Sequence, residues 1–186
     1  MRRQLLPAIR MFLVLTVVCG GIYPLAVTAI AQVTMGSKAD GSLVTANGRT
    51  VGSALIGQSF TGAQWFHGRP DPFDPTASGA TNLGPTNTTL IADDRTAVAK
   101  LVSAGAKEPI PADAISGSGS GLDPDISPAY AKVQVPSVAA ARGLAVDDVL
   151  ALVAAHTQGR QLGFLGDPHV NVLALNLALE QLASTR

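Results

Sequence analysis

The chain has 186 residues, enough for one modest domain and one further segment, and its thirteen basic residues balance its thirteen acidic residues. The charges are unevenly placed. Arg2, Arg3 and Arg10 precede the first acid, and the residues after Arg10 carry ten basic and thirteen acidic side chains. This acidic excess gives the body no electrostatic basis for binding DNA or RNA, which excludes a nucleic-acid partner. Cys19 is the single cysteine and lies in an apolar stretch, so the rest of the chain can form neither a disulfide nor a cysteine metal site.

Residues 11–35 form an uncharged apolar stretch that is long enough to cross a membrane. A helix of this length spans roughly 37 Å, and the hydrocarbon core of a bilayer is about 30 Å thick. Pro24 and the pair Gly20-Gly21 would weaken a soluble helix, but a membrane helix tolerates them where a neighbouring helix packs closely. We therefore predict a transmembrane helix over 11–35.

The orientation of this span follows from the positive charge before it. The arginines predict a cytoplasmic segment at 1–10 and an extracytoplasmic domain at 36–186, in a protein that crosses the cytoplasmic membrane once. A cleaved signal peptide is the alternative, because Ala29-Ile30-Ala31 fits the small residues of a cleavage site. The apolar region of a signal peptide is about 7–15 residues long, and this stretch is longer, so we prefer a retained anchor.

The first half of the body combines a hairpin, a long loop and a helix. Alternating apolar residues flank Asn47-Gly48 within 42–56, and this dipeptide is typical of a type I′ hairpin turn. A loop rich in Gly, Pro, Asn and Thr follows over 57–89, and its aromatic residues argue against disorder. Apolar residues at helical spacing then predict a helix over 89–104, capped by Asn87 or Thr88.

The second half of the body is mainly helical. A short strand is predicted over 113–116. Periodicity and capping signals predict helical segments over 128–134, 137–142, 146–157 and 172–183. The pair Ser127-Pro128 suits the start of the first, and Asn171 is expected to cap the last. Together these elements predict an α+β fold, in which one N-terminal transmembrane helix precedes a small extracytoplasmic domain.

The glycine-rich loop at 116–121, with the sequence SGSGSG, raises the question of phosphate binding, because backbone amides can surround an anion. A P-loop also needs a lysine after its glycines, and none follows here, so we prefer a turning loop. The histidines lack the paired spacing of helical zinc ligands, so no metal site is predicted. A membrane-tethered or secreted hydrolase that uses His156 or His169 with a loop serine remains an alternative, as does a stand-alone binding module.

Five residues are candidates for docking a partner. Arg69 and Arg160 lie beside glycines and can bind a carboxylate or an acidic loop, although bonding to carbonyls of their own chain is the simpler interpretation. Trp65 and Phe66 belong to the long loop and form either a small core or part of a docking surface. Asn82 lies further along the same loop and completes the set.

Four stretches of the chain carry a resemblance to a known family. They are GSALIGQSF with WFHGRPDPFD over 52–74, SGATNLGPTN over 78–87, SGSGLDPDISP over 118–128, and HTQGRQLGFLGDPHVNVLALNLAL over 156–179. In this order they resemble the KdpC family, the C subunit of the potassium-transporting Kdp ATPase. The apolar span matches in position, with its Tyr23-Pro24, whereas Asp125 stands where the family commonly has histidine.

The resemblance implies a non-catalytic accessory subunit of an ATP-driven potassium uptake complex. Its expected partners are a potassium-channel-like subunit and a P-type ATPase subunit, together with membrane lipid around the N-terminal helix. Two roles are associated with the family: a catalytic chaperone that raises the ATP affinity of the ATPase subunit, and a domain over the outer mouth of the channel-like subunit. The predicted topology favours the second role, because an outside domain does not meet cytosolic ATP.

A direct nucleotide role would involve a short set of residues. The resemblance implies Ser118, Gly119, Ser120, Gly121 and Gln134 for that role. ATP would then be bound only together with the ATPase subunit, and no other cofactor is expected.

Overall fold

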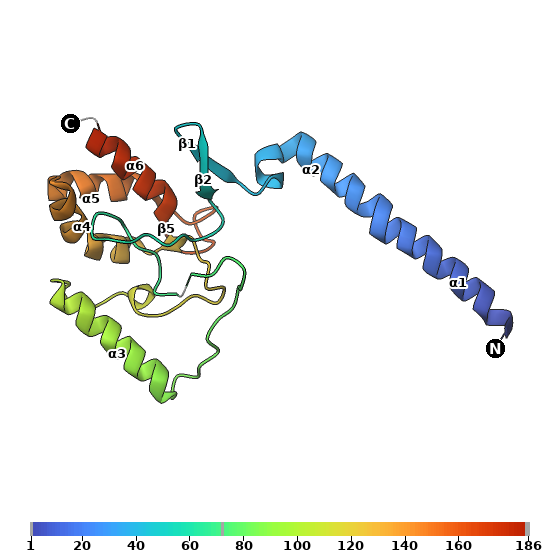
Figure 1. The fold of residues 1–186 in the computed structure, drawn as a ribbon, viewed down its shortest axis with the longest axis horizontal. Helices are drawn as coiled ribbons and strands as arrows, with labels where there is room; N and C mark the ends of the chain where they lie inside the picture. The colour runs from blue at the N-terminus through green and yellow to red at the C-terminus, as the bar shows by residue number, and fades with distance from the viewer. Residues whose placement is uncertain (1, 72, 185–186) are drawn as a thin grey trace. The chain divides into compact units, whose positions relative to one another are not determined.

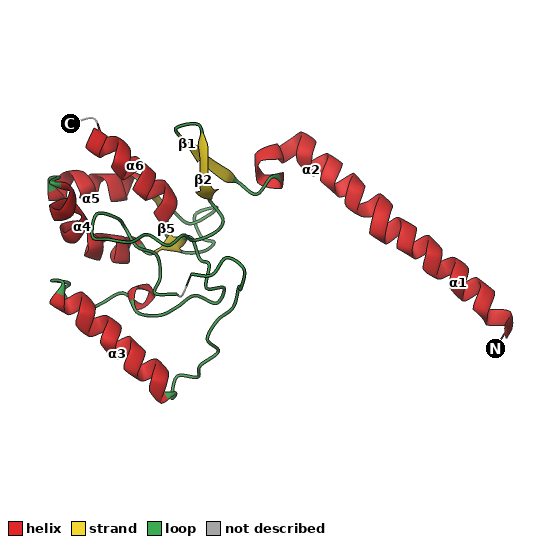
Figure 2. Ribbon diagram, in the orientation of Figure 1, coloured by secondary structure: helices red, strands yellow, loops and turns green. Residues whose placement is uncertain are grey.

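The computed structural model describes residues 2–71 and 73–184 and divides the chain into two compact units, Met1–Leu43 and Val44–Arg186. The first unit is a long apolar helix, and the second is a small domain of helices and short strands (Figures 1 and 2). The predicted α+β class is therefore confirmed.

A π-helical turn interrupts the helix of the first unit. The segments in order are α1 (Arg2–Val17), the π turn η1 (Val18–Ile22) and α2 (Tyr23–Ala39). Pro24 has no N–H to donate to the carbonyl four residues earlier. The N–H of Tyr23 donates instead to the carbonyl of Val18, five residues earlier, as in a π-helix. The proline therefore widens one turn, and the chain stays helical as far as Met35, whose φ of −150° and ψ of 49° kink α2 at the end of the apolar stretch.

Apolar side chains are exposed along this helix. Phe12, Leu25 and Val33 are 70%, 71% and 87% exposed, an arrangement that lipid favours and water does not. Among the described residues, Arg3–Ala39 is the one helix long and apolar enough to cross a membrane, with a mean hydropathy of 2.1 over its most apolar window. The span predicted over 11–35 lies within it.

The β-hairpin predicted around Asn47-Gly48 is confirmed. Strands β1 (Leu43–Ala46) and β2 (Arg49–Ser53) pair as a two-stranded sheet. Asn47 and Gly48 have φ angles of 51° and 75°, and two successive positive φ angles are the signature of a type I′ turn. Asparagine and glycine adopt these angles more readily than other residues do.

The core of the second unit lies between three helices and a three-stranded antiparallel sheet (Figure 1). The helices are α4 (Pro128–Arg142), α5 (Val146–Ala155) and α6 (Val172–Ser184). The strands are β3 (Asp125–Ile126), β4 (Thr157–Gln158) and β5 (His169–Asn171), with β5 in the centre. Val170 of β5 pairs with Ile126 on one side and Thr157 on the other, so the middle strand joins two distant parts of the chain.

Two predicted elements were wrong. Residues 113–116 were expected to form a strand, but the chain there makes the 3₁₀ turn η2 (Ala112–Ala114). The turn brings the carboxylate of Asp113 to the start of α4, where it accepts hydrogen bonds from the N–H (2.6 Å) and the hydroxyl (2.9 Å) of Ser127. The local sequence pattern could not reveal this capping contact, because Asp113 and Ser127 are fourteen positions apart.

The predicted break in the middle of α4 was also wrong. Helical segments were expected to end near Gln134 and to resume at 137, and Pro136 between them is a residue that disfavours a helix interior. The helix instead runs without a break to Arg142, and Pro136 lies on its exposed side. The carbonyl that the proline leaves unpaired belongs to Lys132, which is also exposed, so water can satisfy it.

Helix α3 (Thr88–Ser103) lies on the side of the domain away from α5 and α6 (Figure 1). Of the two predicted caps it is Asn87 that caps the helix, and its side-chain oxygen accepts hydrogen bonds from the N–H groups of Thr89 (2.8 Å) and Leu90 (3.3 Å). None of the residues of α3 is fully buried, and Leu101 packs against the core. This helix is therefore held more loosely than the other three.

Candidate functional site

The loop that carries the predicted docking residues is fastened to the core by two buried carboxamide side chains. Asn176 of α6 accepts a hydrogen bond from the N–H of Phe66 and donates one to its carbonyl, both at 2.9 Å. Gln134 of α4 makes the same pair of bonds to the next residue, His67, at 2.8 and 3.0 Å. Each side chain therefore satisfies both main-chain groups of one loop residue, as a neighbouring β-strand would.

The double fastening places Phe66 in the centre of the core. Its side chain is 0% exposed, whereas Asn176 is 1% and Gln134 is 9% exposed. Buried amides are stable only when their donors and acceptors are paired, and here the loop backbone supplies those partners. Gln134, a candidate for a nucleotide-linked role, thus has both ends of its amide bonded to the protein itself.

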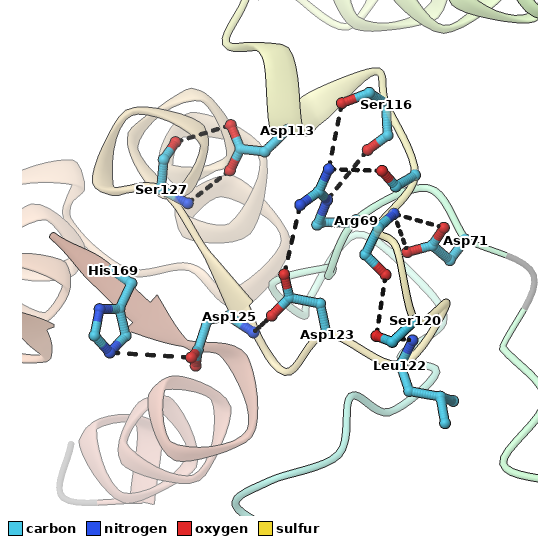
Figure 3. A network of polar contacts seen from close by, with 12 residues as sticks. Arg69, Asp71, Asp113, Ser116, Ser120, Leu122, Asp123, Asp125, Ser127 and His169 are labelled. Carbon is cyan, nitrogen blue, oxygen red and sulfur yellow. Dashed lines mark hydrogen bonds and ion pairs between the residues drawn. The ribbon is translucent and has the colours of Figure 1, made fainter. Parts of the chain in front are cut away.

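Arg69 follows this fastened segment and binds the glycine-rich loop (Figure 3). Its guanidinium donates to the carbonyls of Ser116 (3.2 Å) and Gly117 (2.6 Å) and to the Ser116 hydroxyl (3.4 Å). It also pairs with the carboxylate of Asp123 at 3.5 Å. These contacts lie at the two ends of the loop formed by residues 116–123, so Arg69 holds both ends of the loop.

The amide groups inside this loop are occupied by its own side chains and by Asp71 (Figure 3). Both carboxylate oxygens of Asp71 accept a hydrogen bond from the N–H of Ser118 at 2.9 Å. The hydroxyl of Ser118 accepts from Gly121 N–H (2.8 Å), and that of Ser120 accepts from Leu122 N–H (3.1 Å). Three of the amides that could have surrounded a phosphate therefore already have acceptors.

The arrangement decides what chemistry the glycine-rich loop can offer. A phosphate cradle needs free N–H groups that point at the ligand and a positive charge beside them. In this loop a carboxylate occupies the place where an anion would bind, and the positive charge of Arg69 is directed at carbonyls and at Asp123. The geometry favours a rigid structural loop over a phosphate site.

A cavity of about 560 Å³ lies beside this network, between α3 and the core. Aromatic, aliphatic and charged side chains line it, among them Phe60, Trp65, His67, Lys100 and Leu101. Trp65 packs on Phe60, with ring centroids 5.7 Å apart, on one wall. The cavity is therefore apolar over much of its surface, and its polar positions include Arg69, Asp71 and Asp123 as well as the lysine and the histidine.

Burial lowers the pKa of His67 below its ordinary value of 6.5. The hydrogen bond with Gln134 raises this pKa and the positive charge of Lys100 lowers it, and burial is the largest of the three effects. Below pH 6.5 the unfolded chain therefore binds a proton at this residue that the folded chain does not yet bind. The free energy of unfolding is thus expected to fall as the pH decreases through this window.

Replacing His67 by glutamine removes this contribution to the pH dependence. We expect the free energy of unfolding of H67Q to decrease less than that of the wild type between pH 6.5 and 5. Urea unfolding of the full-length chain in detergent, followed by fluorescence of its single tryptophan, measures both slopes. Equal slopes for the two proteins would contradict the assignment of the lowered pKa to His67.

The other two histidines face structural partners. Nε2 of His169 lies 4.0 Å from the Asp125 carboxylate across the β3–β5 pair (Figure 3). Its Nδ1 lies 3.0 Å from the carbonyl of Asp167. Nδ1 of His156 lies 3.0 Å from the carbonyl of Leu152 in its own helix. These contacts fix the ends of α5 and β5, and they give the hydrolase alternative no positive support.

The loop between β4 and β5 has an exposed apolar tip, which residues 162–165 form. The N–H and C=O groups of Gln161 and Leu165 bond to each other at 2.9 Å in both directions. Leu162 and Gly163 between them have φ angles of 53° and 83°, and Phe164 N–H donates to the Gln161 carbonyl at 3.2 Å, as in a type I′ turn. A leucine in this conformation costs about 1–2 kcal/mol relative to glycine.

The remaining docking candidates lie apart from the Arg69 network. Trp65 is half-buried, and the guanidinium of Arg142 lies 4.2 Å from the centre of its ring. Asn82 is exposed in the long loop with a φ of 55°, an angle that asparagine tolerates well. Arg160 forms an exposed ion pair with Asp167 at 2.8 Å, which joins the two sides of the β4–β5 loop.

Comparison with known proteins supports one family across the whole chain. The family model described as "KdpC: K+-transporting ATPase, c chain" matches residues 5–181. A potassium-transporting ATPase KdpC subunit from Geobacter sulfurreducens is 50% identical, covering 97% of this chain and 98% of its own. Those from Mycobacterium bovis and Gemmatimonas aurantiaca are each 51% identical, covering 98% and 100% of this chain and 100% and 96% of their own.

The chain belongs to the KdpC family. The match confirms the resemblance that the sequence motifs indicate, and it identifies the chain as an accessory subunit rather than the catalytic one of a potassium-transporting ATPase. The matched region includes both the apolar helix and the domain, so the two units belong to one family architecture.

Some residues that build the KdpC site were not found by sequence reasoning. Asn176 and Asp71 were overlooked, because a carboxamide on an apolar helix and an acid in a proline-rich loop are unremarkable in isolation. One signal was available for Asn176: it interrupts the apolar face of α6 between Leu175 and Leu179, where a buried polar side chain requires a partner. Its partner, 110 positions earlier, could not be identified from spacing alone.

Proposed function

We propose that this KdpC chain is the single-span accessory subunit of an ATP-driven potassium uptake complex, whose domain lies outside the cytoplasmic membrane and docks on the channel-like and ATPase subunits. The family match from residue 5 to residue 181 carries this proposal, because it includes the apolar helix together with the domain. That helix exposes apolar side chains along its length, which supports its retention in lipid as an anchor.

The proposed orientation is supported by charge. Arg3 and Arg10 lie on the N-terminal side of the apolar stretch, and basic residues next to a span favour the cytoplasmic side. The polypeptide from Val44 onward would then lie outside, together with the cavity and the glycine-rich loop.

Labelling of single cysteines tests the orientation. With Cys19 replaced by alanine, we expect Ala154→Cys, an exposed position on α5, to react with a membrane-impermeant maleimide in intact spheroplasts. The matched control Gln4→Cys, on the other side of the span, should react only after the membrane is permeabilised. Reaction of the two cysteines in the opposite pattern would contradict the orientation, and loss of residue 4 from the mature chain would show a cleaved leader.

We further propose that any effect of this subunit on ATP affinity is indirect. The amides of Ser118, Gly121 and Leu122 are bonded within the domain, and Gln134 is bonded at both ends to His67. An effect on nucleotide binding would then be transmitted through the other subunits as a coupling free energy between sites. Saturable binding of ATP to the purified full-length chain alone would contradict this proposal.

The docking candidates divide into two groups by their exposure. Phe66 and Arg69 are bonded inside the domain, and we propose that they position the loop rather than contact a partner. Asn82 and Arg160 are exposed, and Trp65 is half-buried, so these three can contact another subunit. The proposed docking surface therefore consists of loop residues held in place by a buried framework.

A further inference from the structure

We propose that the apolar tip at residues 162–165 inserts into an apolar pocket on another protein subunit of the same transporter. The proposal rests on the proposed function, since it requires that the chain assembles with other subunits. It assigns a role to side chains that the core does not use, and it names a contact that the motif resemblance does not specify.

The tip concentrates apolar surface at the end of a loop. Leu162 is 83% exposed, Phe164 is 69% and Leu165 is 48% exposed. Isolated exposed apolar residues are common, but three within four positions form a patch that water does not favour. Large apolar and aromatic side chains that project from a surface are typical anchors of protein interfaces.

The shape of the tip is fixed before any partner binds. The two hydrogen bonds between Gln161 and Leu165 close the loop, and the Arg160–Asp167 ion pair ties its base. A loop that is ordered in advance loses little conformational entropy on binding, so its apolar contacts contribute more fully to affinity.

The backbone at Leu162 gives a second, independent reason to expect a partner. The residue has a φ of 53° in a turn where asparagine or glycine would be unstrained. Leucine here gains no burial within the domain to offset that strain, because its side chain is almost fully exposed. Strained residues of this kind are typical of functional positions, and contact with a partner would provide the missing burial.

The charges around the tip favour a protein pocket over a lipid surface. Loops that insert into membranes are usually flanked by basic residues, which are attracted to anionic headgroups. Here Arg160 is neutralised by Asp167, and the residues after Arg10 carry an acidic excess. The base of the tip therefore offers no net positive charge to attract an anionic bilayer, whereas an apolar pocket on a protein needs none.

Replacing Leu162 by asparagine separates docking from folding. Asparagine suits the positive φ angle, so L162N should unfold at the same temperature as the wild type or higher. We expect the amount of the other subunits that co-purifies with L162N from detergent-solubilised membranes to be at least tenfold lower than with the wild type. The matched control is L55N, which replaces a leucine that is 62% exposed elsewhere in the domain and should recover them normally.

A photoreactive benzophenone side chain in place of Phe164 identifies the contact directly. We expect ultraviolet light to link it to a protein subunit in intact membranes. Equal recovery by the wild type and L162N, or cross-links to lipid alone, would overturn the tip proposal and leave the proposed function standing. Failure of the wild-type chain to recover any other subunit would overturn both.

Discussion

Replacing Asn176 by alanine is expected to lower the free energy of unfolding by about 3–5 kcal/mol. The substitution leaves the N–H and the carbonyl of Phe66 without partners at a position where the side chain of Phe66 is fully buried. Each unpaired buried group costs about 1–3 kcal/mol, and the space left by the amide adds to the loss. Few single changes in this domain combine two such losses.

Urea unfolding of the full-length chain in detergent measures this effect. Trp65 is the single tryptophan and neighbours Phe66, so its fluorescence reports directly on release of the fastened loop. Asn176→Leu keeps the branched shape with a somewhat larger volume but makes none of the hydrogen bonds, and it should be nearly as unstable as the alanine variant. Glu180→Ala, at an exposed position on the same helix, should change stability by less than about 0.5 kcal/mol. A wild-type midpoint for both Asn176 variants would contradict the proposed fastening.

The second large effect is expected at Arg69. Its removal frees the carbonyls of Ser116 and Gly117 and leaves Asp123 without its cation. We expect R69A to lose about 1–3 kcal/mol of stability, and the amides of the loop at 116–123 to exchange with solvent at least tenfold faster. R69K should rescue little, because a lysine cannot reproduce the planar fork that reaches both ends of the loop.

Hydrogen exchange followed by mass spectrometry distinguishes this structural role from direct docking. A structural Arg69 predicts faster exchange in the isolated full-length chain, before any partner is present. Unchanged exchange in R69A, together with loss of the other subunits from pull-downs, would instead place Arg69 at an interface. Asp167→Ala is a suitable control, because it breaks an exposed ion pair far along the sequence and should leave the loop at 116–123 protected.

The elements predicted correctly from the sequence are those with local causes. Asn47-Gly48 specifies its hairpin through two positive φ angles, and Asn87 specifies the start of α3 through its own side chain. Asn171 was likewise expected to cap the last helix, and its side-chain oxygen accepts from Ala174 N–H at 3.1 Å. In each case the decisive interaction lies within four residues.

The features that were missed depend on contacts between distant residues. The three-stranded sheet is built from strands of two or three residues, too short for alternation to be visible, and Asp125 pairs with Asn171 from a distant part of the chain. The candidate site shows the same limit. Arg69 and Ser118 were each singled out, but the sequence did not reveal that they belong to one network in which Asp71 occupies the amide of Ser118.

Co-purification with the rest of the transporter tests the central claim most directly. The tagged full-length chain would be solubilised from its own membranes in mild detergent, its partners identified by mass spectrometry, and potassium-stimulated ATPase activity measured in the eluate. We expect a P-type ATPase subunit and a large polytopic subunit in fixed proportion to the chain, with activity present. Repeated recovery of the folded chain alone, without either subunit and without ATPase activity, would contradict its assignment as an accessory subunit of the pump.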